Sequence, residues 1–583
     1  MDAFIDTEHV LRFGSFELDV RSRELRTGTK SVRLQEQPFE ILRMMLERPG
    51  HVVTRDELRD RLWPGGTFVD FEHSLNAAVK RLRAALGDDA DNPRFIETLP
   101  RRGYRFIASI VVGTSGGTEL AGAPPRLRLA VLPFANLSDE SGQEYFTDGL
   151  TEEMIAQLGQ LCRGRIGVIA RWSSMMFKGT TQRAWQIGQA LRADYILEGG
   201  VRREGDRVRI TARLIETSGE THLWAETYER HLTDCLSVQA DVATRIAQSL
   251  ALELAPGQPP AAQAAFTSAS AYQAYLQGRY HWNKPGIEGV EDALSYYTEA
   301  LKLDPQFAPA HAGVARVYVT RAEYYREQPR RALETARTAA KRALELDPGQ
   351  SEAHLALGDV RRMLEWDWRG AENAYSHAIA LNPSQENAHR GYGTLLAALA
   401  RREEAVREAE RACELDPLCL VVSSAAAWVR YLTGDYPAAM AHCRRTIDLD
   451  PQHLISRRIM AAASLQSGRT SDAVEVLDAA HTASRGDPVV ISWLAHAKAV
   501  SGDRQGAVDL LARLRRLDRK QYLPPYHLAM VHVGLGDLDS AFAALQDATV
   551  ECDPALANLA VEPRFQPLRA DARYAPLLEL LGL

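Results

Sequence analysis

The chain has 583 residues, which is too many for a single hydrophobic core, so several domains are expected. Its 69 Lys and Arg residues against 76 Asp and Glu give a formal net charge of -7, which excludes a protein that binds polyanions over its whole surface. No run of about 18 apolar residues occurs, and the longest approach to one is 107–112. The first residues lack the basic and apolar parts of a signal peptide. We therefore expect a cytoplasmic protein that does not enter a membrane.

The N-terminal region begins with short strands and a helix. Alternating apolar and polar residues indicate small antiparallel strands at 13–19, 24–25 and 32–34. A helix is expected over 38–47, because its apolar residues recur at spacings of three and four and so share one face. These residues are Phe39, Leu42, Met45 and Leu46.

Two further helices and a hairpin complete this region. Thr54 and Glu57 have the spacing of a capping box, which predicts a second helix that runs to Trp63. A third helix is expected over 74–86, with one apolar and one polar face. The apolar face comprises Leu75, Val79, Leu82 and Leu86, and the polar face Asn76, Lys80, Arg81 and Arg83. Two short strands then flank a tight turn at 100–103.

Residues 10–110 resemble the OmpR/PhoB-type winged helix-turn-helix, through this order of elements and the phrases GHVVTRDELRDRLW, VKRLRAAL and GYRF. The resemblance implies that the third helix enters the major groove of double-stranded DNA, where Arg and Asn read base edges. It also implies that the wing reaches the minor groove, whose negative potential attracts cations.

The same resemblance assigns roles to single residues. Arg81 aligns with a base-reading arginine and Arg83 with an arginine that contacts phosphate. Asn76, Ala77 and Ala78 lie where the first turns of the helix face the bases. The other expected contacts are Lys80 on the helix, Arg101 and Arg102 at the wing tip, and Trp63 against the DNA backbone.

The charge of this region and the order of the domains limit the kinds of DNA-binding protein that the sequence fits. Residues 1–110 contain 18 Lys or Arg and 18 Asp or Glu, so DNA binding depends on cations that share one face. We expect that no receiver domain precedes the winged helix, an arrangement that resembles the CadC-type one-component regulators. Many of those proteins cross the membrane just after the wing, whereas here the Gly- and Pro-containing segment 111–125 has the composition of a linker.

A second linker at 255–267 delimits a middle domain over 126–254. We expect an α/β fold, with strands at 129–134 and 166–170, helices at 147–161 and 185–191, a three-stranded meander over 195–228 and a closing helix at 238–254. The phrases AVLPFANLS, DGLTEEM, DYILEGGV and LWAETYER resemble the TolB N-terminal/FlgO-like domain.

This middle domain has few signs of catalysis. It lacks the nucleotide-binding and hydrolase motifs, and the six cysteines of the chain have no metal-ligand spacing. Asp148, Glu152, Glu153 and Glu198 could form an acidic site, although the pattern favours helix capping and a solvated helix face. We therefore predict no enzymatic activity, no cofactor and no metal.

The region 268–583 is repetitive. The phrases ALKLDP, ALELDP, AIALNP, ACELDP and TIDLDP end in prolines that are spaced 43, 35, 34 and 34 residues apart. A period of 34 with small residues such as Gly393, Ala405 and Gly434 at helix contacts resembles tetratricopeptide repeats. We expect about eight units, an insertion around 324–331 and a closing helix near 574–581. Such arrays bind a protein or peptide in a concave groove.

The predicted architecture is thus multidomain, with an α+β winged helix, an α/β domain and an all-α repeat array. It favours a one-component transcriptional regulator that acts as a dimer on DNA and takes its input through the last two domains, with RNA polymerase as a further candidate partner. One alternative is an interaction scaffold whose winged helix docks protein. Another is an enzyme, since similar domains also occur beside cyclase or kinase domains.

Overall fold

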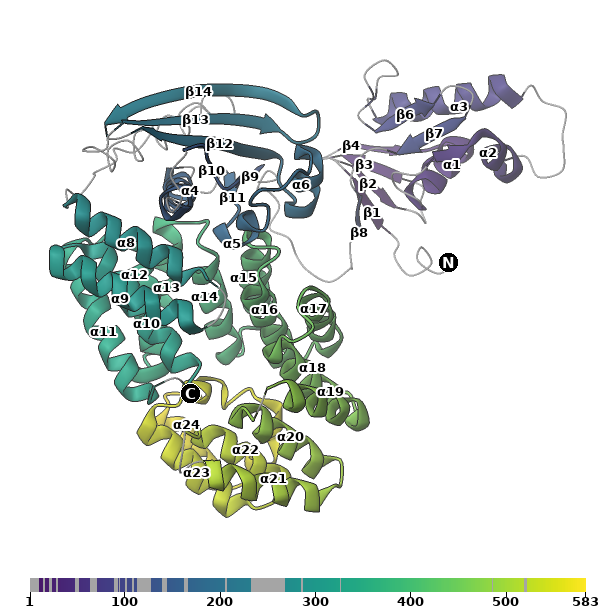
Figure 1. Ribbon diagram of the computed structural model, residues 1–583. Helices are drawn as coiled ribbons and strands as arrows, with labels where there is room; N and C mark the ends of the chain where they lie inside the picture. The colour runs from purple at the N-terminus through teal and green to yellow at the C-terminus, as the bar shows by residue number, and fades with distance from the viewer. Residues whose placement is uncertain are drawn as a thin grey trace. The chain divides into compact units, whose positions relative to one another are not determined.

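The computed structural model shows two compact units, Met1–Pro124 and Pro125–Leu583, which are described separately (Figure 1). The structure describes residues 10–583 except 14–15, 20–23, 28–29, 48–51, 63–70, 87, 89–92, 94, 100–101, 107–109, 113–126, 139–143, 162–165, 205–206, 232–267, 285–286, 326, 485 and 518–521. The helix predicted at 238–254 lies outside these residues. Among the described helices, none is both long and apolar enough to cross a membrane.

The first unit contains two antiparallel sheets, with strand orders β4-β3-β2-β1-β8 and β5-β7-β6. Their strands are β1 (Val10–Phe13), β2 (Phe16–Asp19), β3 (Glu24–Thr27), β4 (Lys30–Arg33), β5 (Val52–Thr54), β6 (Ile96–Leu99), β7 (Gly103–Phe106) and β8 (Ile110–Val112). Strand β8 comes from the apolar run at 107–112 and was not expected. It pairs antiparallel with β1, and Val112 lies opposite Leu11.

Three helices, α1 (Glu36–Glu47), α2 (Arg55–Leu62) and α3 (Phe71–Leu86), complete the unit. The predicted apolar faces of α1 and α3 are confirmed, because each of their four residues is buried in the core. The capping box is also confirmed. The backbone N of Thr54 donates to Glu57 Oε2 at 2.8 Å, and the backbone N of Glu57 donates to Thr54 Oγ1 at 3.2 Å. Helix α3 begins three residues earlier than predicted, where Phe71 packs against the core.

The middle domain is built on a six-stranded sheet with the order β11-β9-β12-β13-β14, and β10 lies beside β12. The predicted meander is confirmed in the antiparallel strands β12 to β14, whereas β11, β9 and β12 run parallel. The predicted strand at 166–170 is shorter than expected, and an unexpected helix, α5, follows it. The elements are β9 (Leu127–Val131), β10 (Ala135–Asn136), α4 (Glu144–Leu161), β11 (Ile166–Val168), α5 (Arg171–Met175), α6 (Ala184–Leu191), β12 (Tyr195–Glu204), β13 (Arg207–Glu216) and β14 (Thr221–His231).

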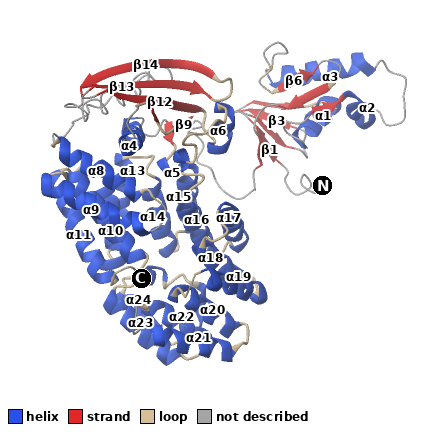
Figure 2. Ribbon diagram, viewed as in Figure 1, coloured by secondary structure: helices blue, strands red, loops and turns tan. Residues whose placement is uncertain are grey.

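From residue 269 on, the described chain is helical and folds into eight successive helix pairs (Figure 2). The first helices of the pairs are α8 (Ala269–Trp282), α10 (Ala308–Glu323), α12 (Ser351–Val360), α14 (Glu386–Ala398), α16 (Leu420–Leu432), α18 (Leu454–Gln466), α20 (Pro488–Val500) and α22 (Pro525–Leu535). The second helices are α9 (Ile287–Leu303), α11 (Pro329–Leu346), α13 (Trp368–Leu381), α15 (Arg402–Leu415), α17 (Tyr436–Leu449), α19 (Thr470–Ala483), α21 (Arg504–Leu517) and α23 (Leu538–Glu551). A π-helical turn, η2 (Arg361–Glu365), extends α12.

Small residues serve the repeats in two ways. A Cβ at Gly393 would lie 3.1 Å from the backbone of Ala405, so this glycine allows α14 and α15 to approach as predicted. Gly434 was expected to act similarly, but that expectation is wrong. A Cβ there would meet nothing within 4 Å, and its φ of 87° shows that it forms the left-handed turn before α17.

The C-terminal segment folds back onto the array through η3 (Pro554–Asn558), η4 (Pro563–Leu568) and α24 (Tyr574–Leu580). Trp368 Nε1 donates to the carbonyl of Leu581 at 2.8 Å, which joins α13 to the end of the chain. Phe565 is fully buried with its ring centroid 4.9 Å from that of Tyr526 on α22. This segment therefore packs against α13 and α22 of the array.

Candidate nucleic-acid interface

Helix α3 places its polar side chains opposite its buried face. Asn76, Lys80 and Arg81 are exposed, as a surface that reads DNA requires. Ala77 is half-buried, whereas Ala78 is fully buried in the core. The expectation that Ala78 faces the bases is therefore wrong, because the helix turns its Cβ toward the core beside Val79 and Leu82.

Two side chains that the sequence did not single out hold Asn76. The Tyr104 hydroxyl donates to Asn76 Oδ1 at 2.8 Å, and Arg55 donates to the same oxygen at 3.4 Å. The Arg55 guanidinium also lies over the Tyr104 ring, 5.4 Å from its centroid. Because these donors occupy the two lone pairs of the amide oxygen, the exposed NH₂ group is the part of Asn76 that can contact a base acceptor.

Arg81 and Lys80 differ in how they are held. The Arg81 guanidinium donates to the side-chain oxygen of Gln35, just before α1, at 2.6 Å, a contact that positions this guanidinium. Within the described residues, Lys80 makes no hydrogen bond or ion pair. An exposed guanidinium held by one neutral amide keeps other N–H groups for bidentate contact with guanine.

Arg83, another predicted DNA contact on α3, has a structural role in the winged-helix unit. Its NH2 group donates to the carbonyl of Ile96 at 2.7 Å and to Thr98 Oγ1 at 2.8 Å. Its Nε lies 3.9 Å from the Asp88 carboxylate. Arg83 therefore ties α3 to β6 of the hairpin, and a phosphate contact would have to use its remaining N–H groups.

The hairpin turn is anchored to the start of α2. The backbone N of Arg55 donates to the carbonyl of Arg102 at 3.1 Å, and Arg102 itself is exposed. A side chain at Gly103 would overlap the carbonyl oxygen of Val53, so only glycine allows β7 to approach β5 here. Arg101 and Trp63, the other two expected contacts, lie outside the described residues.

Ion pairs within the unit neutralise several cations away from the exposed face of α3. Arg105 pairs with Glu97 across the two hairpin strands, Arg59 pairs with Asp56, and Arg43 with Glu40. The placement of charge therefore matters more than the net charge, because Lys80 and Arg81 lie on one helix and neither has an ion-pair partner among the described residues.

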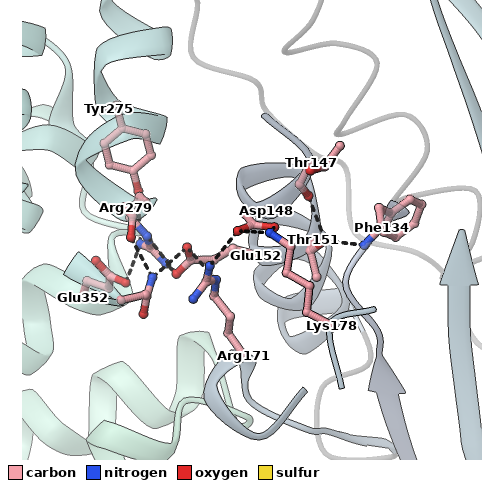
Figure 3. Close-up of polar contacts among 11 residues, drawn as sticks. Phe134, Thr147, Asp148, Thr151, Glu152, Arg171, Lys178, Tyr275, Arg279 and Glu352 are labelled. Carbon is pink, nitrogen blue, oxygen red and sulfur yellow. Dashed lines mark hydrogen bonds and ion pairs between the residues drawn. The ribbon is translucent and has the colours of Figure 1, made fainter. Parts of the chain in front are cut away.

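The acidic residues of the middle domain form an ionic clamp between this domain and the repeats, which Figure 3 shows. Asp148 accepts from Lys178 Nζ at 2.9 Å. Glu152 accepts from Arg279 Nε of α8 at 2.9 Å and lies 3.6 Å from Arg171 Nε of α5. The expectation of a solvated helix face is therefore wrong for Asp148 and Glu152, which are both buried.

Charge compensation explains how these carboxylates tolerate burial. Burial alone would raise the pKa of Glu152, but the guanidinium groups of Arg279 and Arg171 hold it below its usual value. Arg279 also donates to Glu352 of α12 at 2.7 Å, which extends the clamp into the third helix pair. Glu198 lies apart on β12, where it faces Arg213 at 3.9 Å.

A second contact joins the middle domain to the turns between repeats. Asp416, of the phrase ACELDP, accepts from both the backbone N and the hydroxyl of Ser173 at 3.0 and 2.6 Å. The Ser173 hydroxyl in turn accepts from the backbone N of Leu418 at 2.8 Å. Ser384, one repeat earlier, accepts from the backbone N of Val168 at 3.1 Å. The turns between repeats thus bind the middle domain, in addition to ending helices.

Each of three acidic residues of the middle domain faces a cation. Asp148 faces Lys178, Glu152 faces Arg279 and Glu198 faces Arg213. In the part of the chain that the structure describes, no group of three His, Cys, Asp or Glu residues could hold a metal ion.

Family models match three parts of the chain. Residues 28–106 match "Transcriptional regulatory protein, C terminal", residues 126–247 match "HilA/YgeH-like transcriptional regulator, second domain", and residues 393–453 match "Tetratricopeptide repeat". The model that matches the middle domain is thus the HilA/YgeH-like one, and its resemblance to TolB stays a prediction.

Individual proteins are similar to this chain over different lengths. Transcriptional regulator HilA of Salmonella typhimurium is 24% identical over 452 residues, 77% of each chain. A protein named putative adenylate cyclase 3 of Rhizobium meliloti is 32% identical over 248 residues, and this chain spans 42% of its length. The Klebsiella pneumoniae RstA DNA-binding domain, solved in complex with its RstA box, is 31% identical over 17% of this chain and 96% of that chain, with a TM-score of 0.16.

The winged helix and these matches define a class of protein, the DNA-binding transcriptional regulators with an OmpR/PhoB-type domain. Within that class, the chain combines this domain with a HilA-like second domain and tetratricopeptide repeats.

Proposed function

We propose that this protein is a one-component regulator that reads double-stranded DNA with the exposed side of α3 and receives its input through the second unit. The observation that carries the proposal is the separation of faces on α3, with Asn76, Lys80 and Arg81 exposed above a buried apolar side. An α-helix of this kind fits the major groove, and the turn that carries Arg102 stands beside it in the fold, as a wing does.

The proposed DNA contacts fall into two groups. Asn76 and Arg81 would read bases, whereas Lys80, Arg83, Arg101, Arg102 and Trp63 would contact the backbone or the minor groove. Base contacts supply specificity and phosphate contacts supply affinity that depends on salt. A single winged helix reads a short half-site, so we further propose that two copies bind one operator.

The second unit would regulate DNA binding by the winged helix rather than act as an enzyme. The ionic clamp supports this role, because it uses the buried acidic residues of the middle domain to fix α4 and α5 onto the repeats. We propose a cytoplasmic site of action, since the target is chromosomal DNA. RNA polymerase and a protein that docks on the repeats remain the candidate macromolecular partners.

A gel-shift series with genomic fragments in rising salt tests the proposal. The full chain should retain some fragments at a salt concentration that releases bulk competitor DNA, and Arg81→Ala should weaken this preference. Arg342→Gln, an exposed residue of α11, serves as the matched control and should bind as the wild type does. The proposal fails if no fragment is bound even at low salt, which would favour a winged helix that docks protein.

A further inference from the structure

Strand β14 forms one edge of the sheet of the middle domain, and its 11 residues make it the longest strand that the structure describes (Figure 1). It pairs antiparallel with β13, from Arg207 opposite His231 to Glu216 opposite Thr221. Among the described residues, no strand pairs with its other side. An edge of this length presents a row of backbone N–H and C=O groups that can pair with another strand.

The opposite edge of the same sheet is short and lies against the repeats. It is formed by β11, which has three residues. The backbone N of Val168 on this strand donates to the Ser384 hydroxyl at 3.1 Å, and a Cβ at Gly167 would lie 3.2 Å from the Arg411 side chain. The sheet therefore has one edge that the repeats hold, and one edge, β14, that pairs with no further strand of the described chain.

The middle of β14 is exposed on both of its faces. Successive residues of a strand point to opposite faces, yet Ala225, Glu226 and Thr227 are all exposed. Lysine and proline, two residues with which natural proteins discourage pairing at sheet edges, are absent from this strand. The described part of the chain therefore leaves the middle of β14 accessible to a partner.

The charges along β14 limit how it could pair with a second copy of itself. Its register with β13 shifts near its start, so the regular part is 224–231. Two copies of this part would pair antiparallel around a twofold axis. An axis at Glu226 or Glu229 would place like charges opposite each other, which destabilises a strand pair. Near the middle of the regular part, the remaining positions for the axis are Thr227 and Tyr228.

We propose that two copies of this protein associate through β14, with the twofold axis at Thr227 or Tyr228, so that their two sheets become continuous. Main-chain hydrogen bonds hold such a strand pair together. The Tyr228 hydroxyl takes no part, since it donates to Glu226 of its own chain at 2.6 Å. The association would bring two winged helices to one operator at a raised effective concentration. In that role it rests on the proposed function; as an association in solution, it does not.

Cross-linking of the full chain, without DNA, tests the pairing. Thr227→Cys places a thiol at or beside the twofold axis, so a short bismaleimide should join two copies into a covalent dimer. Thr221→Cys is the matched control, because Thr221 is an exposed residue of the same strand that lies outside its regular part. The control should give no more dimer than the wild type. The pairing is refuted if Thr227→Cys gives no more dimer than this control.

Sedimentation equilibrium is a second measurement, and it starts from the wild-type chain, which should show a monomer–dimer equilibrium without DNA. Thr227→Glu places like charges opposite each other for either axis, so its dimer should be at least about tenfold weaker. Thr221→Glu should dimerise as the wild type does. A wild-type chain that stays monomeric, or equal dimer affinities of the two variants, would overturn the proposal. Either result leaves the gel-shift test of DNA binding by the winged helix untouched.

Discussion

The two units of the molecule use arginine in opposite ways. In the winged-helix unit, Arg81 is exposed on α3 and is held by a neutral amide, so its charge is available to another molecule. In the second unit, Arg564 is buried and Arg279 is half-buried, and each is paired with a carboxylate that helps to hold the fold together. The comparison shows that the burial and partner of an arginine, rather than its presence, distinguish a binding residue from a structural one.

The largest effect is expected where a buried ion pair of the second unit is broken. Glu562→Ala leaves the Arg564 guanidinium buried without its carboxylate, so the free energy of unfolding of the repeats should fall by about 3–5 kcal/mol. Urea denaturation followed by circular dichroism measures this change. Asp571→Ala, which breaks an exposed contact with Arg573, is the control and should cost much less, because solvent screens an exposed pair. Equal effects of the two variants would remove the contrast between buried and exposed arginines.

A smaller effect, with a pH dependence, is expected at the contact between the middle domain and the repeats. Burial raises the pKa of Asp416 to about 6 from 3.8. The folded state therefore binds this proton more tightly than the unfolded state, and the stability that protonation supplies is lost as pH rises from about 4 to above 6. Burial and the nearby Asp416 raise the pKa of Glu386 to about 8. The carboxyl groups of Glu386 and Asp416 therefore titrate together.

Asp416→Asn should consequently stabilise the second unit at neutral pH. The amide oxygen can still accept from Ser173, and the cost of a buried charge is removed. We expect a gain of about 1–3 kcal/mol at neutral pH that disappears toward about pH 4. Asp450→Asn, at the same position of the next repeat, should show no such gain. A loss of stability at neutral pH would mean that Asp416 is needed in its charged form.

The smallest effect concerns the side chain that positions Asn76. Tyr104→Phe removes the hydroxyl that donates to Asn76 Oδ1, so affinity for the operator should fall by about 0.5–1.5 kcal/mol with little change in stability. Fluorescence anisotropy with a labelled operator measures this loss. Tyr228→Phe, in the second unit, removes a comparable hydroxyl and should not alter DNA binding. Unchanged affinity for Tyr104→Phe would show that Asn76 needs no support.

The sequence predicted much of the first unit, because its signals are local. The capping box of Thr54 and Glu57 and the buried face of α3 follow from residues three or four positions apart. The contact of Tyr104 with Asn76 was missed, since it joins residues 28 positions apart.

The second unit was harder to predict for the same reason. The clamp between Glu152 and Arg279 spans 127 positions, and the contact of Tyr431 with Glu562 spans 131. The repeat period predicted the helix pairs but not the segment that packs across them. A carboxylate on a helix looks solvated when its partner is so distant in sequence, which is why Glu152 was misjudged.

The most direct test of the central claim, that the exposed face of α3 reads DNA, is selection of binding sites from a random duplex library. The wild-type chain should select a short motif, present as two half-sites, that contains at least one guanine. Arg81→Ala should lose the preference for this guanine, by about 1–3 kcal/mol, while the rest of the motif remains. An identical motif from the wild type and Arg81→Ala, or no motif from the wild type, would contradict the claim.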